Sequence, residues 1–257
     1  MKHPLRTLLL AVCCGLAAAC TQRQERLKLM SYNIRNGIGF DNIQDIGRIA
    51  RVILREAPDL VALQELDSAT LRVDGRYIPG ELGRMTGMHA TFGRAIGFAG
   101  GSYGVGLLSR TEPLAVRSIP LPGREEARVL LMAEFPDYTV CVTHLSLPPE
   151  DRLASLPIIR EATDTCRKPV LLAGDFNTGD AAAVLAGLGG GFRILSDTTR
   201  MTFPSDNPAV RIDYILSHGL PTSATVAESA VDHTAAASDH CPLWVTLAWK
   251  RGKQPGK

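Results

Sequence analysis

The sequence lacks the features that mark several classes of protein. No internal repeat, low-complexity tract or Ser/Gly-rich linker interrupts the middle of its 257 residues, which argues against a repeat array or a chain of linked modules. No apolar run reaches the roughly 20 residues that a transmembrane helix needs. The six cysteines lack zinc-site spacing. With 45% apolar and 21% charged residues, the chain suits one large globular domain.

The chain also lacks a basic excess outside its two ends. Its formal charge is +2, but Lys2 and Arg6 lie near the N-terminus, and residues 250–257 contain four cations and no acid. Without both ends, the body is net negative by four. Nonspecific DNA binding depends on a basic surface that neutralises phosphates. The composition therefore argues against a nonspecific DNA-binding protein, although it leaves a local basic patch open.

The first 19 residues have the pattern of an export signal. Two basic residues precede an apolar stretch from Leu8 to Ala19, which is too short to span a bilayer. Small residues before Cys20 resemble the lipobox of bacterial lipoproteins, although alanine replaces the usual leucine. We expect export, lipidation of Cys20 and anchoring at the cell envelope. Plain secretion and an uncleaved anchor are the alternatives.

Behind this signal peptide (1–19), the expected organisation is a short tether (20–26), one domain (27–249) and a basic tail (250–257). Cys141, Cys166 and Cys241 would remain in the domain, and their number and spacing leave their disulfide state open. Cys141 stands in an apolar run, so we expect it to be a small core residue.

Apolar patterning predicts many strands and few helices. Strands are expected at residues 27–34, 59–66, 104–109, 127–135, 139–145, 169–173, 211–216 and 241–249, and helices at 41–55, 80–86 and 150–166. This order is not the regular alternation of a doubly wound sheet. It favours two mainly antiparallel sheets packed face to face, with helices outside.

Polar residues stand at the ends of these predicted strands. They are Asn33, Glu65, His144, Asp175 with Asn177, Asp213, and Asp239 with His240. Carboxylates and amides of this kind suit a hard divalent cation, and histidines suit proton transfer and phosphate contact. Each residue alone has a simpler reading as a turn, a cap or a solvated strand end. Together they predict a metal-dependent active site at one edge of the sheets.

Some roles follow from position. A charge at the end of a core strand is costly unless paired or metal-bound, so Glu65 is predicted to be a metal ligand. Asp239 is a second candidate ligand, and His240 would contact phosphate. Asp213 would orient His240 and favour its charged form. Asp175 would bind metal or orient a water.

The other candidates have more open roles. Asn177 would hold a phosphate oxygen, His144 would act in catalysis or phosphate binding, and Asn33 would support the metal or its carboxylate ligands. Arg128 would meet an anionic substrate or pair with the neighbouring glutamates. Tyr103 and Phe203 would line the pocket or pack on its rim.

Six motifs together resemble the endonuclease/exonuclease/phosphatase superfamily, the DNase I-like fold. They are Tyr32-Asn33-Ile34, Leu63-Gln64-Glu65, Thr143-His144-Leu145, Gly174-Asp175-Phe176-Asn177, Arg211-Ile212-Asp213-Tyr214-Ile215 and Ser238-Asp239-His240. The resemblance implies a four-layered α/β sandwich and a Mg2+ or Mn2+ enzyme that cleaves phosphate esters. It implies that Glu65 is the main metal ligand, with Asp239 and Asn33 beside it, and that Asp175 activates water.

Two departures narrow the implied activity. Val105 replaces an Asn-Ala pattern found in many relatives, so a polar substrate contact is absent there. His144 stands where abasic-site enzymes similar to exonuclease III have tyrosine, which argues against DNA repair. We expect a monomeric, exported phosphodiesterase or phosphatase that acts on a small, lipid or sugar phosphate. A secreted nuclease is the alternative, and a non-catalytic surface-binding protein is a remote one.

Overall fold

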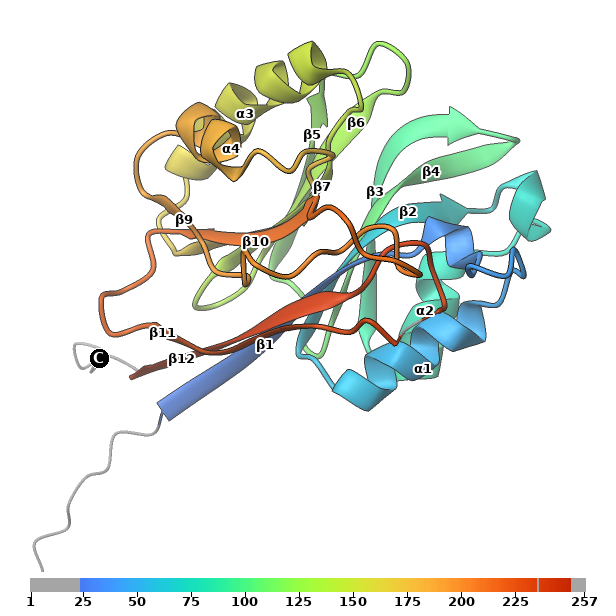
Figure 1. Ribbon diagram of the computed structural model, residues 1–257, viewed down its shortest axis with the longest axis horizontal. Coiled ribbons are helices and arrows are strands. Elements are labelled where there is room, and N and C mark those ends of the chain that lie inside the picture. The colour runs from blue at the N-terminus through green and yellow to red at the C-terminus, as the bar shows by residue number, and fades with distance from the viewer. Residues whose placement is uncertain (1–23, 235, 251–257) are drawn as a thin grey trace, which may run out of the picture.

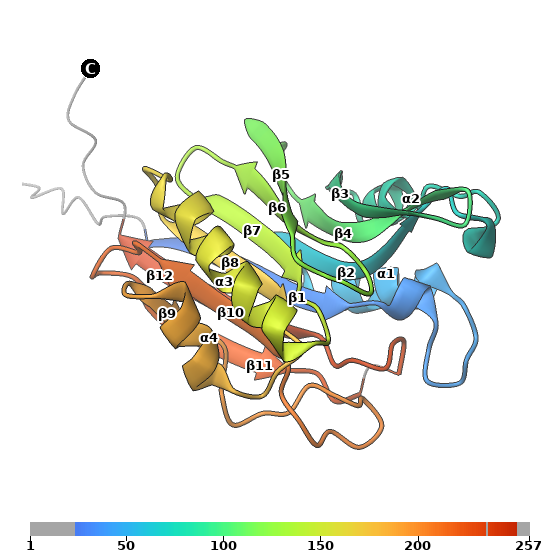
Figure 2. The same cartoon turned by 90° about the horizontal axis from the view of Figure 1, so that it is seen from above.

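The computed structural model describes residues 24–234 and 236–250, and Figure 1 shows its two sheets packed against each other. The expected signal peptide, Cys20 and most of the basic tail lie outside the described residues. Helices α1 (Ile46–Glu56) and α2 (Ile78–Thr86) pack on one sheet, and α3 (Pro149–Asp164) and α4 (Ala181–Leu188) pack on the other. Figure 2 shows α3 lying along the second sheet. The predicted four-layered sandwich is confirmed.

Within the part of the chain that the structure describes, each sheet has six strands and one parallel pairing between neighbours. The first sheet contains, in spatial order, β11 (Thr225–Val231), β12 (Leu243–Lys250), β1 (Gln24–Asn33), β2 (Leu60–Ser68), β4 (Gly101–Ser109) and β3 (His89–Phe98). The second contains β5 (Ala115–Leu121), β6 (Arg128–Glu134), β7 (Thr139–His144), β8 (Val170–Asp175), β10 (Asp213–His218) and β9 (Phe192–Ile194). The parallel pairs are β1 with β2 and β7 with β8. Both sheets are therefore mixed but mainly antiparallel.

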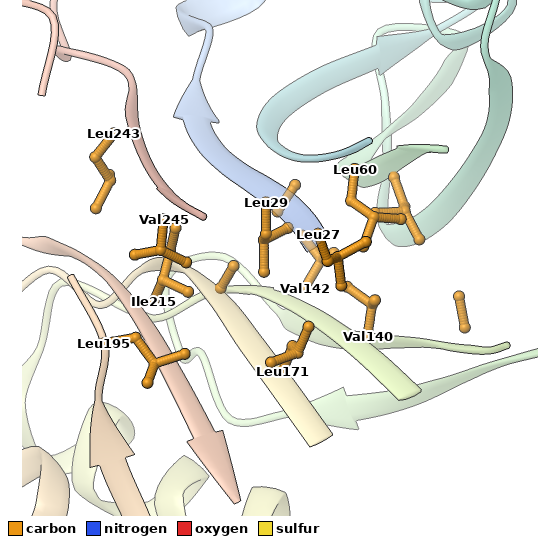
Figure 3. Packing of buried hydrophobic residues seen from close by; sticks show 14 of the residues in the cluster. Leu27, Leu29, Leu60, Val140, Val142, Leu171, Leu195, Ile215, Leu243 and Val245 are labelled. Carbon is orange, nitrogen blue, oxygen red and sulfur yellow. The ribbon is translucent and has the colours of Figure 1, made fainter. Parts of the chain in front are cut away.

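The space between the sheets is filled by alternate residues of the central strands. Leu27 and Leu29 of β1 pack there against Val140 and Val142 of β7 and against Leu171 of β8, as Figure 3 shows. Successive side chains of a strand point to opposite faces, so these rows follow from the period of two. The intervening residues, such as Met30 and Tyr32 of β1, face α1 and α2 instead.

The helices begin and end at recognisable caps. The side chain of Asp45 accepts a hydrogen bond from the amide of Gly47, which fixes the first turn of α1. Ala57 ends the helix with a left-handed backbone. The predicted start at residue 41 was wrong because the chain makes a turn before this cap. Ile46, Ile49 and Ile53 form the buried stripe that the pattern predicted.

The four strands that the pattern did not predict are the four edge strands, β3, β5, β9 and β11. Most of their residues are partly or fully exposed, so their sequences lack a buried apolar face. Helix α4 was also missed. Its sequence is nearly all small or apolar and gives no amphipathic stripe, although Asp180 caps it by accepting from the amide of Ala183.

Two further expectations concern cysteines and membranes. Cys141, Cys166 and Cys241 are free thiols, and Cys141 is fully buried in the core, as predicted. Within residues 24–234 and 236–250, no helix is long and apolar enough to cross a bilayer.

Candidate active site

Three neighbouring strands place His144, Asp175 and Asp213 side by side. His144 and Asp175 are register partners in the parallel pair β7 and β8, and Asp175 and Asp213 are partners in the antiparallel pair β8 and β10. Along each strand, the residues that face the other sheet are apolar, and the residue at this edge of the sheet is polar and buried. His144 and Asp175 end their strands, and Asp213 begins its strand. The expected convergence of polar strand ends at one edge of the sandwich therefore occurs in this sheet.

The opposite sheet contributes Asn33, the last residue of β1, and the segment before β12 that contains Asp239 and His240. The hydroxyl of Ser238 donates to the carbonyl oxygen of Asn33 at 2.8 Å, which joins this segment to β1. The amide of Ser205 donates to the carbonyl of Asp239 at 2.7 Å. These bonds hold the segment at the end of β1, and from there His240 reaches Asp213 and Asp175 of the second sheet.

Glu65 lies in a β-bulge rather than at a strand end. The register of β2 against β4 shifts between Leu63 and Leu66, and β2 continues to Ser68. Glu65 has φ 57°, a left-handed conformation that is uncommon outside glycine and asparagine. Such strain persists where the surrounding structure imposes it, and it is frequent at functional sites. The expectation that Glu65 ends its strand was wrong, because the bulge turns the side chain without ending the pairing.

The amide of Asn33 connects the two groups of acids. Its Nδ2 donates to Glu65 Oε1 and to Asp175 Oδ2, both at 3.1 Å, and its Oδ1 accepts from the amide of Arg35 at 3.1 Å. Both amide hydrogens are therefore used, so the 3.4 Å approach of Nδ2 to His240 is a contact without a third hydrogen. This arrangement fits an Asn33 that supports the carboxylate ligands, while its Oδ1 keeps a second lone pair that could bind a cation.

His240 and Asp213 form a buried ion pair. His240 Nδ1 lies 3.0 Å from Asp213 Oδ2. Burial lowers the pKa of His240, but the charge and hydrogen bond of Asp213 and the charge of Asp175 outweigh it, raising this pKa to about 10. His240 is therefore protonated at neutral pH, with its Nε2 3.7 Å from Asp175.

His144 is in the opposite charge state. Burial, followed by the nearby charges of Arg128 and His240, lowers the pKa of His144 well below its ordinary value. Its Nε2 lies 3.5 Å from Asp175 Oδ2, and its Nδ1 lies 3.3 Å from Arg128 Nη1. The site therefore has one cationic and one neutral imidazole on either side of the same carboxylate.

Asp175 is the carboxylate between them, and its pKa is raised to about 7. Burial is the main cause, followed by the charge of Asp213, while His240 and hydrogen bonds from Asn177 and Asn33 oppose the shift. The amide of Asn177 donates to Asp175 Oδ1 at 2.8 Å. Asn177 itself has φ 51°, and its Nδ2 donates to the carbonyl of Leu145. A buried carboxylate with this pKa can accept a proton near neutral pH.

Glu65 and Asp239 fit a divalent cation. Burial raises the pKa of Glu65, and the negative charges of Asp239 and Glu126 add to that increase. No lysine or arginine within the described residues forms an ion pair with Glu65. Asp239 Oδ2 meets Arg35 Nε at 3.4 Å and is partly exposed. Neighbouring carboxylates with so little compensation suit a hard cation with oxygen ligands.

A second acidic group is buried beside them. The group consists of Asp175, Asp213 and His240. Each offers one carboxylate oxygen or ring nitrogen, and these three atoms lie within 4.8 Å of one another. The Nδ1 of His240 is committed to Asp213, and Asp175 accepts two hydrogen bonds. The donors of this group are paired within the protein, so we consider it better suited to proton transfer than to metal binding.

The three candidate substrate residues lie around the same centre. Arg128 is buried and donates to Glu126 Oε1 at 2.6 Å. Tyr103 is buried and lines a narrow pocket with Arg128 and His144. Phe203 packs on His240, with ring centroids 4.8 Å apart. The pairing of Arg128 with a neighbouring glutamate, one of its two expected roles, is observed.

Sequence reasoning assigned no site role to Glu126, Ser238 or Arg35, although all three contact site residues. Ser238 opens one of the six motifs and Arg35 directly follows another, so their place in the sequence was the only signal. Glu126 was expected only as a partner of Arg128, and this pairing is what brings it to the site. Val105 is buried between the sheets, where it adds no polar group.

Comparisons with known proteins agree with this fold. Residues 30–240 match the model of the "Endonuclease/Exonuclease/phosphatase family". An endonuclease/exonuclease/phosphatase structure from Beutenbergia cavernae has 24% identity, a TM-score of 0.69 and coverage of 87% of this chain and 72% of that one. A mannosyl-6-phosphatase from Bacteroides thetaiotaomicron has 18% identity, a TM-score of 0.69 and coverage of 86% and 99%. D. rerio TDP2 complexed with single-strand DNA product has 22% identity, a TM-score of 0.65 and coverage of 86% and 98%.

Proposed function

The chain belongs to the endonuclease/exonuclease/phosphatase family, and we propose that it is an exported, Mg2+- or Mn2+-dependent phosphodiesterase or phosphatase. One observation supports this most strongly. A carboxylate with a pKa of about 7, Asp175, lies between a protonated His240 and a neutral His144. Hydrolysis of a phosphate ester by water needs a base that accepts a proton from the water. It also needs a cation and a hydrogen-bond donor that stabilise the charge on the phosphoryl oxygens.

In the proposed mechanism, Asp175 accepts a proton from the attacking water. The Asn33 amide and the backbone of Asn177 hold the carboxylate in place through their hydrogen bonds to its two oxygens. A divalent cation held by Glu65 and Asp239 would neutralise the phosphate and the leaving oxygen. No covalent enzyme intermediate is needed, because the water attacks phosphorus directly.

The two histidines then act on the phosphoryl oxygens. His240, kept cationic by Asp213, stabilises the negative charge that grows in the transition state. Neutral His144 donates one hydrogen bond to the same group. Asn177 also lies next to Asp175 and would help to hold a phosphate oxygen. Tyr103 and Phe203, which lie beside the two histidines, would bind the rest of the substrate.

We propose a small-molecule, lipid or sugar phosphate as the substrate. The net negative body of the chain disfavours a long nucleic acid, and the similar B. thetaiotaomicron protein is a mannosyl-6-phosphatase. A nuclease is the second candidate, since the likeness to D. rerio TDP2, solved with a single-strand DNA product, favours nucleic acid. We expect the protein to act as a monomer.

We propose that the protein is lipid-anchored through Cys20 at the cell envelope. The chain enters β1 at Gln24, and Asn33 of the site is at the other end of the same ten-residue strand. At roughly 3.3 Å a residue, this strand separates the two by about 30 Å. An anchor before β1 would therefore leave the site facing away from the membrane. Mass measurement of the mature protein tests the lipid, and an unmodified N-terminus would remove this proposal.

A screen of phosphate esters tests the activity. The domain from Arg23 onward would be incubated with mono- and diesters, sugar and lipid phosphates, and supercoiled plasmid, each with Mg2+ or Mn2+. We expect hydrolysis of a small ester that Glu65→Ala abolishes. Rapid plasmid nicking that is also lost in Glu65→Ala would favour the nuclease instead, and no hydrolysis of any ester would leave the non-catalytic alternative.

A further inference from the structure

Arg128 is a buried arginine whose guanidinium lies between a carboxylate and the ring of His144. Its side chain is only 8% exposed, and its Nη1 is shared between Glu126 Oε1 at 2.6 Å and His144 Nδ1 at 3.3 Å. The start of β6 places it beside β7, the strand that ends in His144. The guanidinium therefore contacts a catalytic imidazole on the side away from Asp175.

The guanidinium of Arg128 determines which ring nitrogen of neutral His144 carries the proton. Arginine has only N–H donors and does not lose its proton in proteins. The Nδ1 that faces it must therefore present a lone pair, because an N–H on Nδ1 would point at another donor. The single proton of neutral His144 is then on Nε2, which lies 3.5 Å from Asp175 Oδ2.

We infer that Arg128 is a positioning residue of this site, which fixes His144 in the tautomer with its proton on Nε2, and that Glu126 holds the guanidinium in place for this purpose. The kinetic part of the inference rests on the proposed hydrolytic function. The tautomer itself does not, because it is a property of the protein without substrate.

The charge of Arg128 adds a second effect to the geometry. A cation beside His144 opposes its protonation, as burial and the charge of His240 also do. The groups that face this imidazole are Arg128 from β6, Asp175 from β8 and His240 from the segment before β12, and Glu126 and Tyr103 line the same small pocket. The two carboxylates favour the imidazolium, so the loss of Arg128 would raise the pKa of His144 and release the tautomer.

The partner Glu126 explains why the arginine stays at this place. Its carboxylate binds Nη1, while Arg128 Nε is buried with no partner among the described residues. Glu126 belongs to a loop tied to α3, since Arg124 bonds Asp151 through both its amide at 2.8 Å and its Nε at 3.0 Å. A fixed loop with a fixed carboxylate gives the guanidinium a defined orientation.

Long-range 1H–15N correlation spectra of histidine-labelled protein measure the tautomer directly. In the substrate-free protein, we expect the His144 resonances to show an unprotonated Nδ1 and a protonated Nε2 across the neutral range. In Arg128→Met, which keeps the length without the charge, we expect a mixture of tautomers and protonation at higher pH. Arg84→Met, which removes an exposed arginine on α2, is the matched control and should leave His144 unchanged.

Kinetics separate positioning from a simple substrate contact. Arg128→Met should lower kcat by about tenfold or more, on the scale of losing an oriented donor, and move the acid limb of kcat to higher pH. A pure phosphate contact would raise KM and leave the His144 resonances as they are. Asp175 contributes its own titration to the acid limb in every variant, so the spectra identify the part that belongs to His144.

Two further variants keep the inference testable if Arg128→Met does not fold. Arg128→Lys keeps the charge but not the fork of donors, so it should hold the pKa of His144 low while the tautomers mix. Glu126→Gln should give an intermediate spectrum. A proton on Nδ1 in the wild type, or unchanged His144 spectra in all three variants, would overturn the inference. Missing hydrolysis with the expected spectra would contradict only the proposed function.

Discussion

The imidazole of His240 and the carboxylate of Asp213 meet at 3.0 Å, Nδ1 to Oδ2, where both side chains are almost completely buried. Asp213 is the first residue of β10, and His240 belongs to the segment before β12 in the other sheet. The pair therefore joins the two sheets at the site, and it determines the charge of the histidine that faces the scissile phosphate in our proposal.

Asp213→Asn should shift the pH dependence of hydrolysis. In the wild type, cationic His240 persists until the pH rises through its raised pKa, so activity is retained into the alkaline range. Without the carboxylate, burial is the largest remaining influence and lowers this pKa. We expect kcat to fall by about 10- to 100-fold and its alkaline limb to move to lower pH. The measurement is a pH profile of kcat in both proteins, and coincident alkaline limbs would contradict the role of Asp213.

Asp175→Asn should remove the general base while keeping the size of the side chain. The amide of Asn177 can still donate to the new side-chain oxygen, so the loop after β8 should keep its shape. We expect kcat to fall by about a hundredfold or more, with KM changed much less, and the part of the acid limb that belongs to Asp175 to disappear. A loss below about tenfold in steady-state kinetics would mean that another group accepts the proton.

Gly104→Ala should destabilise the fold near the site. Gly104 faces the bulge where β3 pairs with β4, and a Cβ there would lie 2.1 Å from the carbonyl oxygen of Gly93 and 2.8 Å from the amide of Ala95. Backbone atoms cannot move aside cheaply, so we expect the free energy of unfolding to fall by about 1–3 kcal/mol. Urea denaturation measures it. Gly190→Ala is the control, since nothing lies within 4 Å of its added Cβ, and equal stability losses would contradict the prediction.

The central strands and most of the site could be predicted because apolar runs in the sequence mark the strands and polar residues stand at the ends of these runs. Along β7 and β8, alternate residues are buried between the sheets, and the row ends in His144 and Asp175. Such strands can be read from the sequence as apolar runs, and the places of His144 and Asp175 at the ends of these runs predicted that they meet at one edge. The edge strands could not be predicted this way, because a strand exposed on most of its length has no apolar row to read.

The rest of the site depends on contacts that only the folded chain creates. The bulge at Glu65 needs the pairing of β2 with β4, and the amide orientation of Asn33 is decided by the Arg35 backbone and two carboxylates from other strands. The pairing of Arg128 with Glu126 was one of its expected roles, but the contact of Arg128 with His144 depends on the pairing of β6 with β7. None of these has a pattern of its own in the sequence.

Glu65→Gln should change stability in opposite directions without and with a divalent cation. The raised pKa of Glu65 means that its ionised form destabilises the folded protein at neutral pH, because burial and the charges of Asp239 and Glu126 oppose it. In chelator, the neutral glutamine should therefore raise Tm, since it can still accept from Asn33. With Mg2+ or Mn2+, the wild type should gain Tm by binding, and the variant should gain much less.

Thermal unfolding of both proteins in chelator and over a metal titration measures these changes. Glu112→Gln is the matched control, because Glu112 is an exposed glutamate outside the site, and it should follow the wild type in both conditions. A variant that is less stable than the wild type in chelator would show that Glu65 is stabilised by the protein alone. Equal metal-induced gains in the two proteins would show that the cation binds elsewhere, and the Asp175, Asp213 and His240 group would then be the next candidate.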